Sequence, residues 1–353
     1  MKRTLPPEWA PQDGVMLTWP HPDSDWAPIL PEAEDVFVRI AREVTRRESL
    51  VVACRDEAHE IHVCGELAQS QVDMRRVTTA LAPGNDTWAR DHGPLTILEN
   101  GVPVMLDFTF NGWGGKYPAE ADNRITACLH DQGVFGERAL RPVDFVLEGG
   151  SIESDGLGTL LTTHGCLMTP SRNPGLDTRA VESVLRRELG AQRVLWLKHG
   201  HLEGDDTDGH VDTLARLCDP DTIAHVVCED PEDPHHGPLL AMTRELAALR
   251  TPQGHPYRLV PLPLPAPIHN EEGQRLPATH ANFLIINGAV LVPTYNDPAD
   301  EVALEALAGV FPDREIIGID CRALIRQFGS LHCVTMQIPS LPPLPGPSLP
   351  TPE

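Results

Sequence analysis

The feature that most constrains the fold of this chain is a short hairpin pattern that recurs along its length. Each copy has two apolar runs separated by a turn rich in Asn, Asp, Gly or Pro, which is a strong signal for a β-hairpin. Four copies are present, at residues 95–106, 150–162, 213–227 and 282–293. The chain therefore repeats one small β unit at least four times.

The hairpins alternate with helical patterns, and this alternation predicts the architecture. Apolar residues recur at helical spacing in 176–189, 239–249 and 300–310, and the hairpin turns are roughly 55 to 67 residues apart. A repeat of this size and content indicates a closed radial array of ββαβ-like units. The alternative, a doubly wound α/β sheet, would place single strands rather than hairpins between its helices.

A fifth unit completes this array from the two ends of the chain. We expect the apolar segments 15–19 and 51–53 to join the last strand, at 334–338. No low-complexity linker divides the chain, so we predict a single catalytic domain over residues 1–338. Residues 339–353 contain seven prolines, which favours a disordered or polyproline tail.

Charge and apolar content narrow the possible functions. The formal net charge is −23, which disfavours a nucleic-acid partner because phosphate binding needs a basic face. An acidic surface attracts cationic substrates, although acidity often serves solubility alone. No run of about 18 apolar residues is present, so we expect neither a transmembrane helix nor a membrane partner. The N-terminus lacks the apolar stretch of a signal peptide, which predicts a cytoplasmic protein.

One of the eight cysteines differs from the others. None shows Cys-x-x-Cys spacing, which argues against a disulfide framework and a zinc ribbon, and most lie in apolar surroundings typical of buried, inert thiols. Cys333 instead follows the Gly329-Ser330 turn and His332, and it opens the last predicted strand. A thiol there would point into the central space, and a nucleophile needs access and a nearby base.

A histidine and an aspartate supply a possible acid–base pair. His210 and Asp212 are two residues apart, which on a strand places both side chains on one face. The same residue types also bind zinc or iron, but no third ligand appears at motif spacing, so we predict no metal site. Polar stretches of this kind lie at five predicted strand ends, where function concentrates on rigid scaffolds, at residues 85–94, 111–115, 147–151, 204–212 and 328–333.

Two further carboxylates point to the kind of substrate. Asp91 and Glu148 each precede a glycine-containing turn, which allows a ligand close to the backbone. Taken singly, each acid would be a surface or capping residue. Several acids that converge on a cysteine and a histidine instead suggest a planar cation, and guanidinium has the forked N–H donors that match carboxylates. We therefore predict an enzyme that uses Cys333 against a guanidino carbon, with His210 as proton carrier.

These motifs resemble those of the agmatine deiminase and bacterial peptidylarginine deiminase family, within the guanidine-modifying pentein superfamily. The resemblance covers the chain from Leu5 to about Pro339, and it departs from the commoner pattern in the Gly-Ser-Leu stretch before His332 and in the acidic loop 205–208. The motifs that carry it are Trp-x-Arg-Asp-x-Gly-Pro at 88–94, Leu-Glu-Gly-Gly at 147–150, Gly-His-Val-Asp at 209–212, Gly-Ser-Leu-His-Cys at 329–333 and the opening Pro-Glu-Trp-Ala-Pro-Gln at 7–12.

The resemblance implies a five-bladed α/β propeller with pseudo-fivefold symmetry, in agreement with the repeat pattern. It implies that Cys333 attacks the guanidinium carbon and that His210 protonates the departing ammonia and then activates water. Asp91 and Asp212 would hold the guanidinium nitrogens, and Glu148 would orient His210 and share the positive charge. A covalent amidino-cysteine is then hydrolysed without any cofactor. A homodimer is usual for similar proteins.

Charge matching favours agmatine as the substrate, since agmatine carries a second cation where free arginine carries a carboxylate. By resemblance, Asp206 occupies the position that holds this amine end, and Asp86 is a further candidate. Trp88 and Trp113 are expected to wall the butyl chain. Peptidylarginine, whose tail is neutral, is the second candidate substrate. An amidinotransferase, which would need an amine-acceptor site, and a silent pentein, which would lack the nucleophile, are the remaining alternatives.

Overall fold

The computed structural model describes residues 2–340, and its strands form five sheets. The first two sheets contain β1 (Arg3–Thr4), β5 (Leu95–Glu99), β6 (Val102–Thr109) and β7 (Ala139–Val146), then β8 (Ile152–Ser154), β9 (Thr159–Thr163) and β10 (Arg193–Leu197). The next two contain β11 (Ala215–Asp219), β12 (Thr222–Val227) and β13 (Arg258–Pro263), then β14 (Leu284–Ile286), β15 (Ala289–Thr294) and β16 (Glu315–Asp320). The fifth contains β17 (Thr335–Pro339), β2 (Gln12–Thr18), β3 (Ser49–Cys54) and β4 (Val77–Leu81).

All five sheets repeat one pairing scheme. A first strand pairs antiparallel with a second, as β5 does with β6, and the second pairs parallel with a third, as β6 does with β7. A parallel pair needs a long crossover connection, and here each crossover contains a helix. These helices are α5 (Ile125–Asp131), α7 (Thr178–Leu189), α8 (His236–Ala248), α9 (Ala299–Val310) and, between β2 and β3, α1 (Leu30–Thr45).

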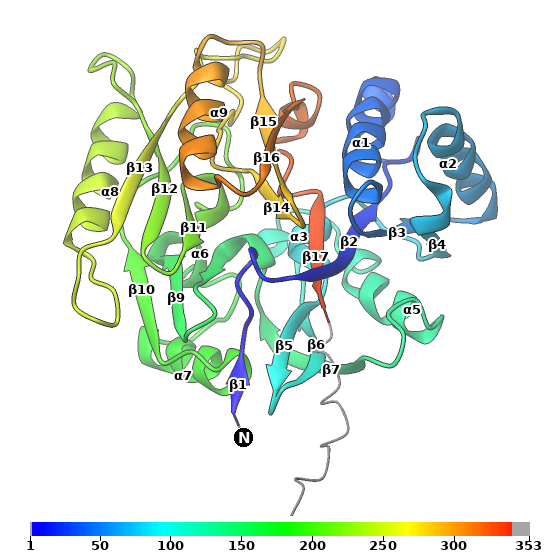
Figure 1. The fold of residues 1–353 in the computed structure, drawn as a ribbon, viewed down its shortest axis with the longest axis horizontal. Coiled ribbons are helices and arrows are strands. Elements are labelled where there is room, and N and C mark those ends of the chain that lie inside the picture. The colour runs from blue at the N-terminus through cyan, green and yellow to red at the C-terminus, as the bar shows by residue number, and fades with distance from the viewer. Residues whose placement is uncertain (1, 341–353) are drawn as a thin grey trace, which may run out of the picture.

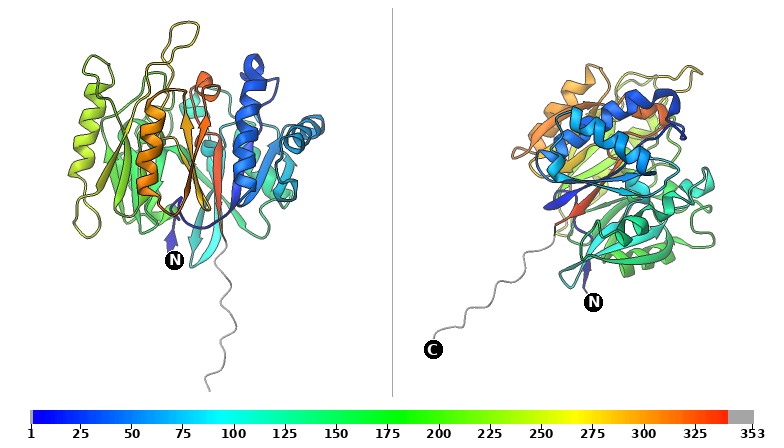
Figure 2. Two further views of the ribbon diagram at one scale, coloured as in Figure 1. Left: turned by 45° about the horizontal axis from the view of Figure 1, so that its top comes forward. Right: turned by 90° about the vertical axis from the view of Figure 1, so that its right-hand side faces the viewer.

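The helices surround the sheets. Figure 1 shows α1, α2 (Glu57–Gln69), α5, α7, α8 and α9 at the periphery, while β14, β17 and the short α3 (Ala89–His92) lie near the centre. Figure 2 shows α8, α9 and α1 standing side by side on the outside of their sheets. The remaining short helices are α4 (Gly112–Gly115), α6 (His164–Leu167), η1 (Ala27–Ile29), η2 (Met74–Arg76), η3 (Asp122–Arg124), η4 (Gly149–Ser151), η5 (Val211–Thr213) and η6 (Leu324–Gln327).

Local sequence explains why these elements form. In α7, Val181, Leu185 and Leu189 recur every four residues and are buried on one face. The Asp177 side chain accepts the backbone N–H of Ala180 at 2.8 Å and caps the start of the helix. The helix ends at Gly190, which adopts left-handed backbone angles, as the sequence predicts. In β9, every residue is buried, as expected for the middle strand of a sheet.

The predicted repeat is confirmed. Each predicted hairpin is present, as β5–β6, β8–β9, β11–β12 and β14–β15, and the predicted helices are present as α7, α8 and α9. The fifth unit also forms as predicted, because β17 from the end of the chain pairs antiparallel with β2 from its beginning. None of the described helices is long and apolar enough to cross a membrane.

The predicted start of the tail, at residue 339, is one correction to the sequence analysis. Pro339 is the last residue of β17, paired with Gln12, and the backbone N–H of Ser340 donates to the Pro11 carbonyl at 2.9 Å. Proline is tolerated here because β17 is an edge strand. The rest of the predicted tail, residues 341–353, lies outside the described residues.

Candidate active site

The five turns that precede the first strands of the sheets meet at the centre and bring the predicted residues together. Asp91 lies in α3 before β5, and Glu148 precedes η4 and β8. His210 and Asp212 lie at η5 before β11, and Cys333 lies in the turn before β17. The fourth turn contributes Asn282, which lies two residues before β14.

Hydrogen bonds join neighbouring turns around the centre. The Gly150 N–H donates to Asp91 Oδ1 at 3.0 Å, and the Thr279 hydroxyl donates to the Thr213 carbonyl at 2.9 Å. The His332 N–H donates to the Asn282 carbonyl at 3.1 Å, and the Arg90 N–H donates to the Cys333 carbonyl at 3.1 Å. The side chains of the site are thereby fixed by backbone that belongs to several units of the repeat.

Gly150 is the residue on which three site side chains converge. A Cβ atom at this position would lie 2.6 Å from His210 Nδ1 and 3.0 Å from both Asp212 Oδ2 and Asp91 Oδ1. No side chain fits there without displacing the histidine. The glycine of the 147–150 motif therefore lets two carboxylates and an imidazole approach one point.

The thiol of Cys333 lies beside Asn282 and Asp212. Its Sγ is 3.4 Å from Asn282 Oδ1 and 4.0 Å from Asp212 Oδ2. Burial raises the pKa of the thiol well above its ordinary value, and the nearby charges of Asp212 and Asp91 raise it further. In the empty site the cysteine is therefore a neutral thiol, and a bound cation would favour the thiolate by countering the two aspartates.

His210 is buried and held by its own turn. The expectation that it shares a strand face with Asp212 is wrong, because both residues lie at η5, before β11 begins. The spacing of two residues alone does not distinguish a strand from such a turn. The ring Nδ1 is 3.6 Å from Asp91 Oδ1, and Nε2 has no hydrogen-bond partner among the described residues. Burial lowers the pKa of His210 to about 3, so the ring is neutral at rest.

Trp113 orients Asp91. The indole Nε1 donates to Asp91 Oδ2 at 2.9 Å, while Gly150 holds the other oxygen. Trp113 adopts left-handed backbone angles (φ 54°, ψ 46°) between glycines in α4. Such angles are unfavourable for a bulky residue and often occur at functional sites. Burial raises the pKa of Asp91, and the charges of Asp212 and Glu148 add to this effect.

Asp212 differs from Asp91 in its surroundings. Its Oδ2 accepts a hydrogen bond from His332 Nδ1 at 2.7 Å, and its buried Oδ1 has no partner in the described part of the chain. Burial alone would raise the pKa of this carboxyl, but the hydrogen bond and charge of His332, together with nearby His210 and Arg216, outweigh burial and lower it. Asp212 therefore offers one unoccupied oxygen of an ionised carboxylate.

Glu148 is paired with a residue that the sequence analysis missed. Both of its oxygens accept from Arg172 Nε, at 2.8 and 3.0 Å, and both side chains are fully buried. A Glu148 oxygen, Cys166 Sγ and a His210 ring nitrogen lie within 4.8 Å of one another. Among the described residues, these three donors form the one grouping spaced for a metal ion. Arg172 already occupies the glutamate as a cation, and burial raises the pKa of the Cys166 thiol, so neither group favours an ion.

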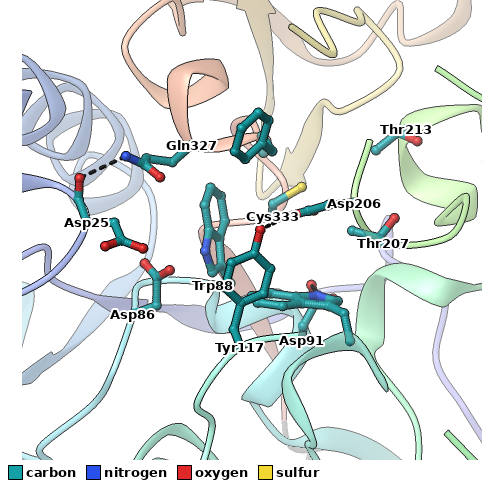
Figure 3. A pocket seen from close by; sticks show the side chains of 13 residues that line it. Asp25, Asp86, Trp88, Asp91, Tyr117, Asp206, Thr207, Thr213, Gln327 and Cys333 are labelled. Atoms are coloured by element: carbon teal, nitrogen blue, oxygen red, sulfur yellow. Dashed lines mark hydrogen bonds between the residues drawn. The ribbon is translucent and has the colours of Figure 1, made fainter. Parts of the chain in front are cut away.

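A pocket leads from the surface to Cys333. Figure 3 shows Asp25, Asp86 and Gln327 on one side of it, Thr207 and Thr213 on the other, and the rings of Trp88 and Tyr117 near Cys333. All four predicted wall and mouth residues line this pocket: Asp86, Trp88, Trp113 and Asp206. None of its described lining residues is a lysine or an arginine.

The mouth acids are held by aromatic side chains. Asp206 Oδ2 accepts the Tyr117 hydroxyl at 2.8 Å, and burial raises the pKa of this aspartate to about 6. Asp86 Oδ1 accepts Trp26 Nε1 at 2.8 Å, and burial raises its pKa as well. Trp88 packs so closely on Gly329 that a Cβ there would lie 2.1 Å from the indole.

Several site residues escaped the sequence analysis. Asn282 and Arg172 sit in stretches without a recognisable motif, and nothing in the sequence reports their proximity to Cys333. Glu8 and His332 lie in motifs that were recognised, yet their side chains received no role. Tyr117 follows the 111–115 stretch by two residues, so a wider window would have included it.

The chain is similar to known proteins over almost its whole length. The family model described as Porphyromonas-type peptidyl-arginine deiminase matches residues 4–339. An agmatine deiminase from Ectopseudomonas mendocina is 32% identical, with 95% of each chain covered. A solved Porphyromonas gingivalis protein described as a candidate arginine deiminase is 54% identical, with a TM-score of 0.90 over 96% of this chain and 98% of its own. A substrate-bound variant of C. jejuni agmatine deiminase is 38% identical, with a TM-score of 0.89 over 96% of both chains.

Proposed function

The chain belongs to the Porphyromonas-type peptidyl-arginine deiminase family, and on that premise we propose that it is an agmatine deiminase. It would hydrolyse the guanidinium group of agmatine to N-carbamoylputrescine and ammonia. Curated agmatine deiminases match 95% of the chain, and a related enzyme has been solved with its substrate bound. The activity is that of a hydrolase of carbon–nitrogen bonds in a linear amidine.

The charge of the pocket carries the choice of substrate. Four aspartates line the route to Cys333, namely Asp25, Asp86, Asp91 and Asp206, and no basic side chain lines it among the described residues. Agmatine is cationic at both ends, so a guanidinium at Asp91 leaves its ammonium near the mouth acids. Free arginine would place a carboxylate among those acids without a partner, and this cost disfavours it.

The reaction begins with a neutral thiol and a neutral imidazole. The substrate cation stabilises the Cys333 thiolate, and the thiol proton passes to His210. The thiolate forms a bond to the guanidinium carbon, and the leaving nitrogen takes the His210 proton and departs as ammonia. Neutral His210 then removes a proton from water, whose oxygen attacks the amidino carbon. The carbon–sulfur bond breaks with its electron pair on sulfur, the hydroxyl proton passes to the thiolate, and N-carbamoylputrescine leaves. His210 loses the proton it took from water to the solvent, which restores the neutral thiol and imidazole.

The carboxylates stabilise charge during these steps. We assign Asp91 and Asp212 to the guanidinium nitrogens, because Asp91 is oriented by Trp113 and Gly150 and Asp212 has an unoccupied buried oxygen. Glu148 is expected to orient His210 and share its positive charge, and its own hydrogen bonds come from Arg172. We infer that it acts on the imidazolium through its charge and through the packing around the ring.

A substrate panel tests this proposal. The full chain is incubated with agmatine, free arginine or an acetylated arginyl peptide, and ammonia and the ureido product are measured. We expect kcat/KM for agmatine to exceed that for either competitor by at least about 100-fold, which corresponds to roughly 2.7 kcal/mol. Turnover of the peptide but not of agmatine would show that the chain is a peptidylarginine deiminase instead.

A cysteine comparison tests the covalent step. Cys333→Ala should reduce kcat by about 10⁴-fold or more, because a nucleophile and its base act as a unit. The matched control is Cys54→Ala, which removes another buried thiol, in β3, away from the pocket. Equal activity in both variants would reject Cys333 as the nucleophile.

A further inference from the structure

His332, the residue before Cys333, lies between two carboxylates from distant parts of the chain. Its Nδ1 is 2.7 Å from Asp212 Oδ2, and its Nε2 is 2.6 Å from Glu8 Oε2. All three side chains are buried. Glu8 belongs to the segment before β2, where Gln12 Nε2 donates to its backbone carbonyl at 2.6 Å. One imidazole ring therefore connects the active site to the N-terminal segment.

The two short contacts constrain the charge of His332. An ionised carboxylate only accepts hydrogen bonds, and a neutral imidazole has a single N–H. If both carboxylates are ionised, both ring nitrogens must carry protons, because an unprotonated nitrogen would face a carboxylate oxygen at hydrogen-bonding distance. Glu8 is kept ionised by its other partners: Arg216 Nη2 lies 3.0 Å from its Oε1, and the Ile285 N–H donates to it at 2.7 Å.

Charge balance in the surrounding buried cluster gives the same answer. Arg216 of β11 also pairs with Glu153 of β8 and stacks on Phe283, 4.6 Å from the ring centre. Arg90 of α3 lies 3.6 Å from Glu8. The acids of this cluster are Glu8, Glu153 and Asp212, of which Glu8 and Asp212 contact His332, and its bases are Arg90 and Arg216. Burial raises the pKa of Glu153, and the charge of Arg216 opposes that rise. With all three acids ionised, a protonated His332 matches three buried negative charges with three positive ones, the balance that burial favours.

From this geometry we propose that Glu8 is a positioning residue, which holds His332 as an imidazolium and through it keeps Asp212 ionised and correctly oriented. His332 occupies Asp212 Oδ2, so that the unpartnered Oδ1 remains available to the substrate. The N-terminal segment would thus set the charge of a carboxylate that it does not touch. The effect on turnover rests on the proposed function, whereas the charge of His332 does not.

The first measurement needs no substrate. The full chain is labelled with ¹⁵N-histidine, and the ring nitrogens of His332 are identified by their absence in His332→Gln. In the parent protein at pH 7.5 we expect both His332 nitrogens to be protonated. In Glu8→Gln, which keeps the size and an acceptor for the Ile285 N–H, we expect a neutral ring with a single proton.

The second measurement is the pH dependence of kcat/KM, which reports ionisations of the free enzyme. Loss of the Glu8 charge weakens the imidazolium, and loss of the imidazolium disfavours ionised Asp212, so its pKa rises. Measured in an Asp206→Asn background, which removes the titration of the mouth aspartate near pH 6, the remaining acid limb should therefore move up by about one pH unit or more in Glu8→Gln, with about a tenfold loss of kcat/KM on that limb. His332→Gln should shift the limb similarly, and the double variant should add little.

Glu48→Gln is the matched control. Glu48 is also buried and also accepts one backbone N–H, from Asn287 at 2.9 Å, but it makes no contact with His332. It should leave both the His332 ring and the acid limb unchanged. If Glu8→Gln does not fold, as judged by circular dichroism, two measurements still test the inference. They are the ¹⁵N spectrum of the parent protein and the pH dependence of kcat/KM in His332→Gln.

Two results would overturn the inference. One is a single ring proton on His332 in the parent protein at pH 7.5. The other is a folded Glu8→Gln variant with an unchanged ring and an unchanged acid limb. A parent chain that shows the doubly protonated ring but does not turn over agmatine would contradict the proposed function alone, and the pH profile would then be measured with whichever panel substrate the chain accepts.

Discussion

Asp91 and Asp212 lie in the same site, but their pKa values are shifted in opposite directions. Burial and two neighbouring acids raise the pKa of Asp91, whereas His332, His210 and Arg216 together outweigh burial at Asp212 and lower the pKa there. Two like charges so close together in a buried site would repel strongly. The empty site therefore favours one ionised aspartate, and a guanidinium allows the second to ionise as it binds.

Asp206 gives a pH prediction at the pocket mouth. Burial raises its pKa to about 6, so the carboxyl is neutral below that pH and does not attract the ammonium of agmatine. We expect kcat/KM for agmatine to fall as pH drops through about 6. Asp206→Asn should lower kcat/KM about tenfold at pH 7.5 and should remove this limb.

The control for that experiment is Asp313→Asn, an exposed aspartate beyond α9 that changes the net charge equally. It separates local pairing from general attraction between an acidic protein and a cation. If Asp206→Asn retains the parent profile, the amine end of the substrate does not bind at Asp206.

At the scale of elements, the site is built from short turns rather than from strands. α3, η4 and η5 are each three or four residues long, and each delivers a functional side chain just before the first strand of a sheet. Turns suit this task because they aim side chains inward while the strands behind them remain fully paired. The strained Trp113 in α4 serves the same purpose, since its indole reaches Asp91 from a neighbouring turn.

Gly150→Ala tests this packing of turns. The added methyl would lie within 3.0 Å of three site atoms, so we expect at least about a 100-fold loss of kcat/KM through misplacement of His210. The thermal midpoint should change little, because the displaced groups are side chains of the proposed site rather than of the apolar core. Gly309→Ala, at a helical position of α9 with open space around its Cβ, is the control and should retain full activity with equal or slightly higher stability. Full activity in Gly150→Ala would contradict the tight geometry.

At the scale of the whole molecule, the two ends of the chain close the array. β17 pairs with β2, and the N-terminal segment supplies Glu8 to the centre. The first and last parts of the described chain must therefore both be in place before the site is complete. The predictions of a homodimer and of a cytoplasmic location concern this scale as well, and they stay predictions.

Asp122 gives a stability prediction for the whole fold. Burial raises its pKa to about 7, although its Oδ1 accepts the N–H groups of Asn85 and Asp86. The folded protein binds this proton more tightly than the unfolded chain, so its contribution to stability is full at low pH and declines as pH rises through about 7. Between pH 6 and pH 8 the loss should be about 1 kcal/mol.

Asp122→Asn keeps the acceptor and removes the titration. The free energy of unfolding is measured in urea at pH 6 and at pH 8 for both proteins. Between these two pH values it should fall by about 1 kcal/mol more in the parent protein than in Asp122→Asn. Some pH dependence should persist, because burial also raises the pKa of Glu48 to about 7. A variant whose stability changes with pH as steeply as the parent's would show that Asp122 is already ionised in the folded protein.

The sequence by itself determined the repeat and predicted a cysteine nucleophile and the residues around it. Hairpin turns and helical periodicity are local signals, so β5–β6 and α7 could be predicted from a few neighbouring residues, and Cys333, His210 and Asp91 lie in short recognisable motifs. Only the tertiary structure decided what surrounds them. Arg172 on Glu148, Asn282 beside the thiol and Glu8 on His332 are contacts between residues 24 to 324 positions apart. Such contacts leave no local pattern, because the distance between two side chains is set by how the five sheets close on one another.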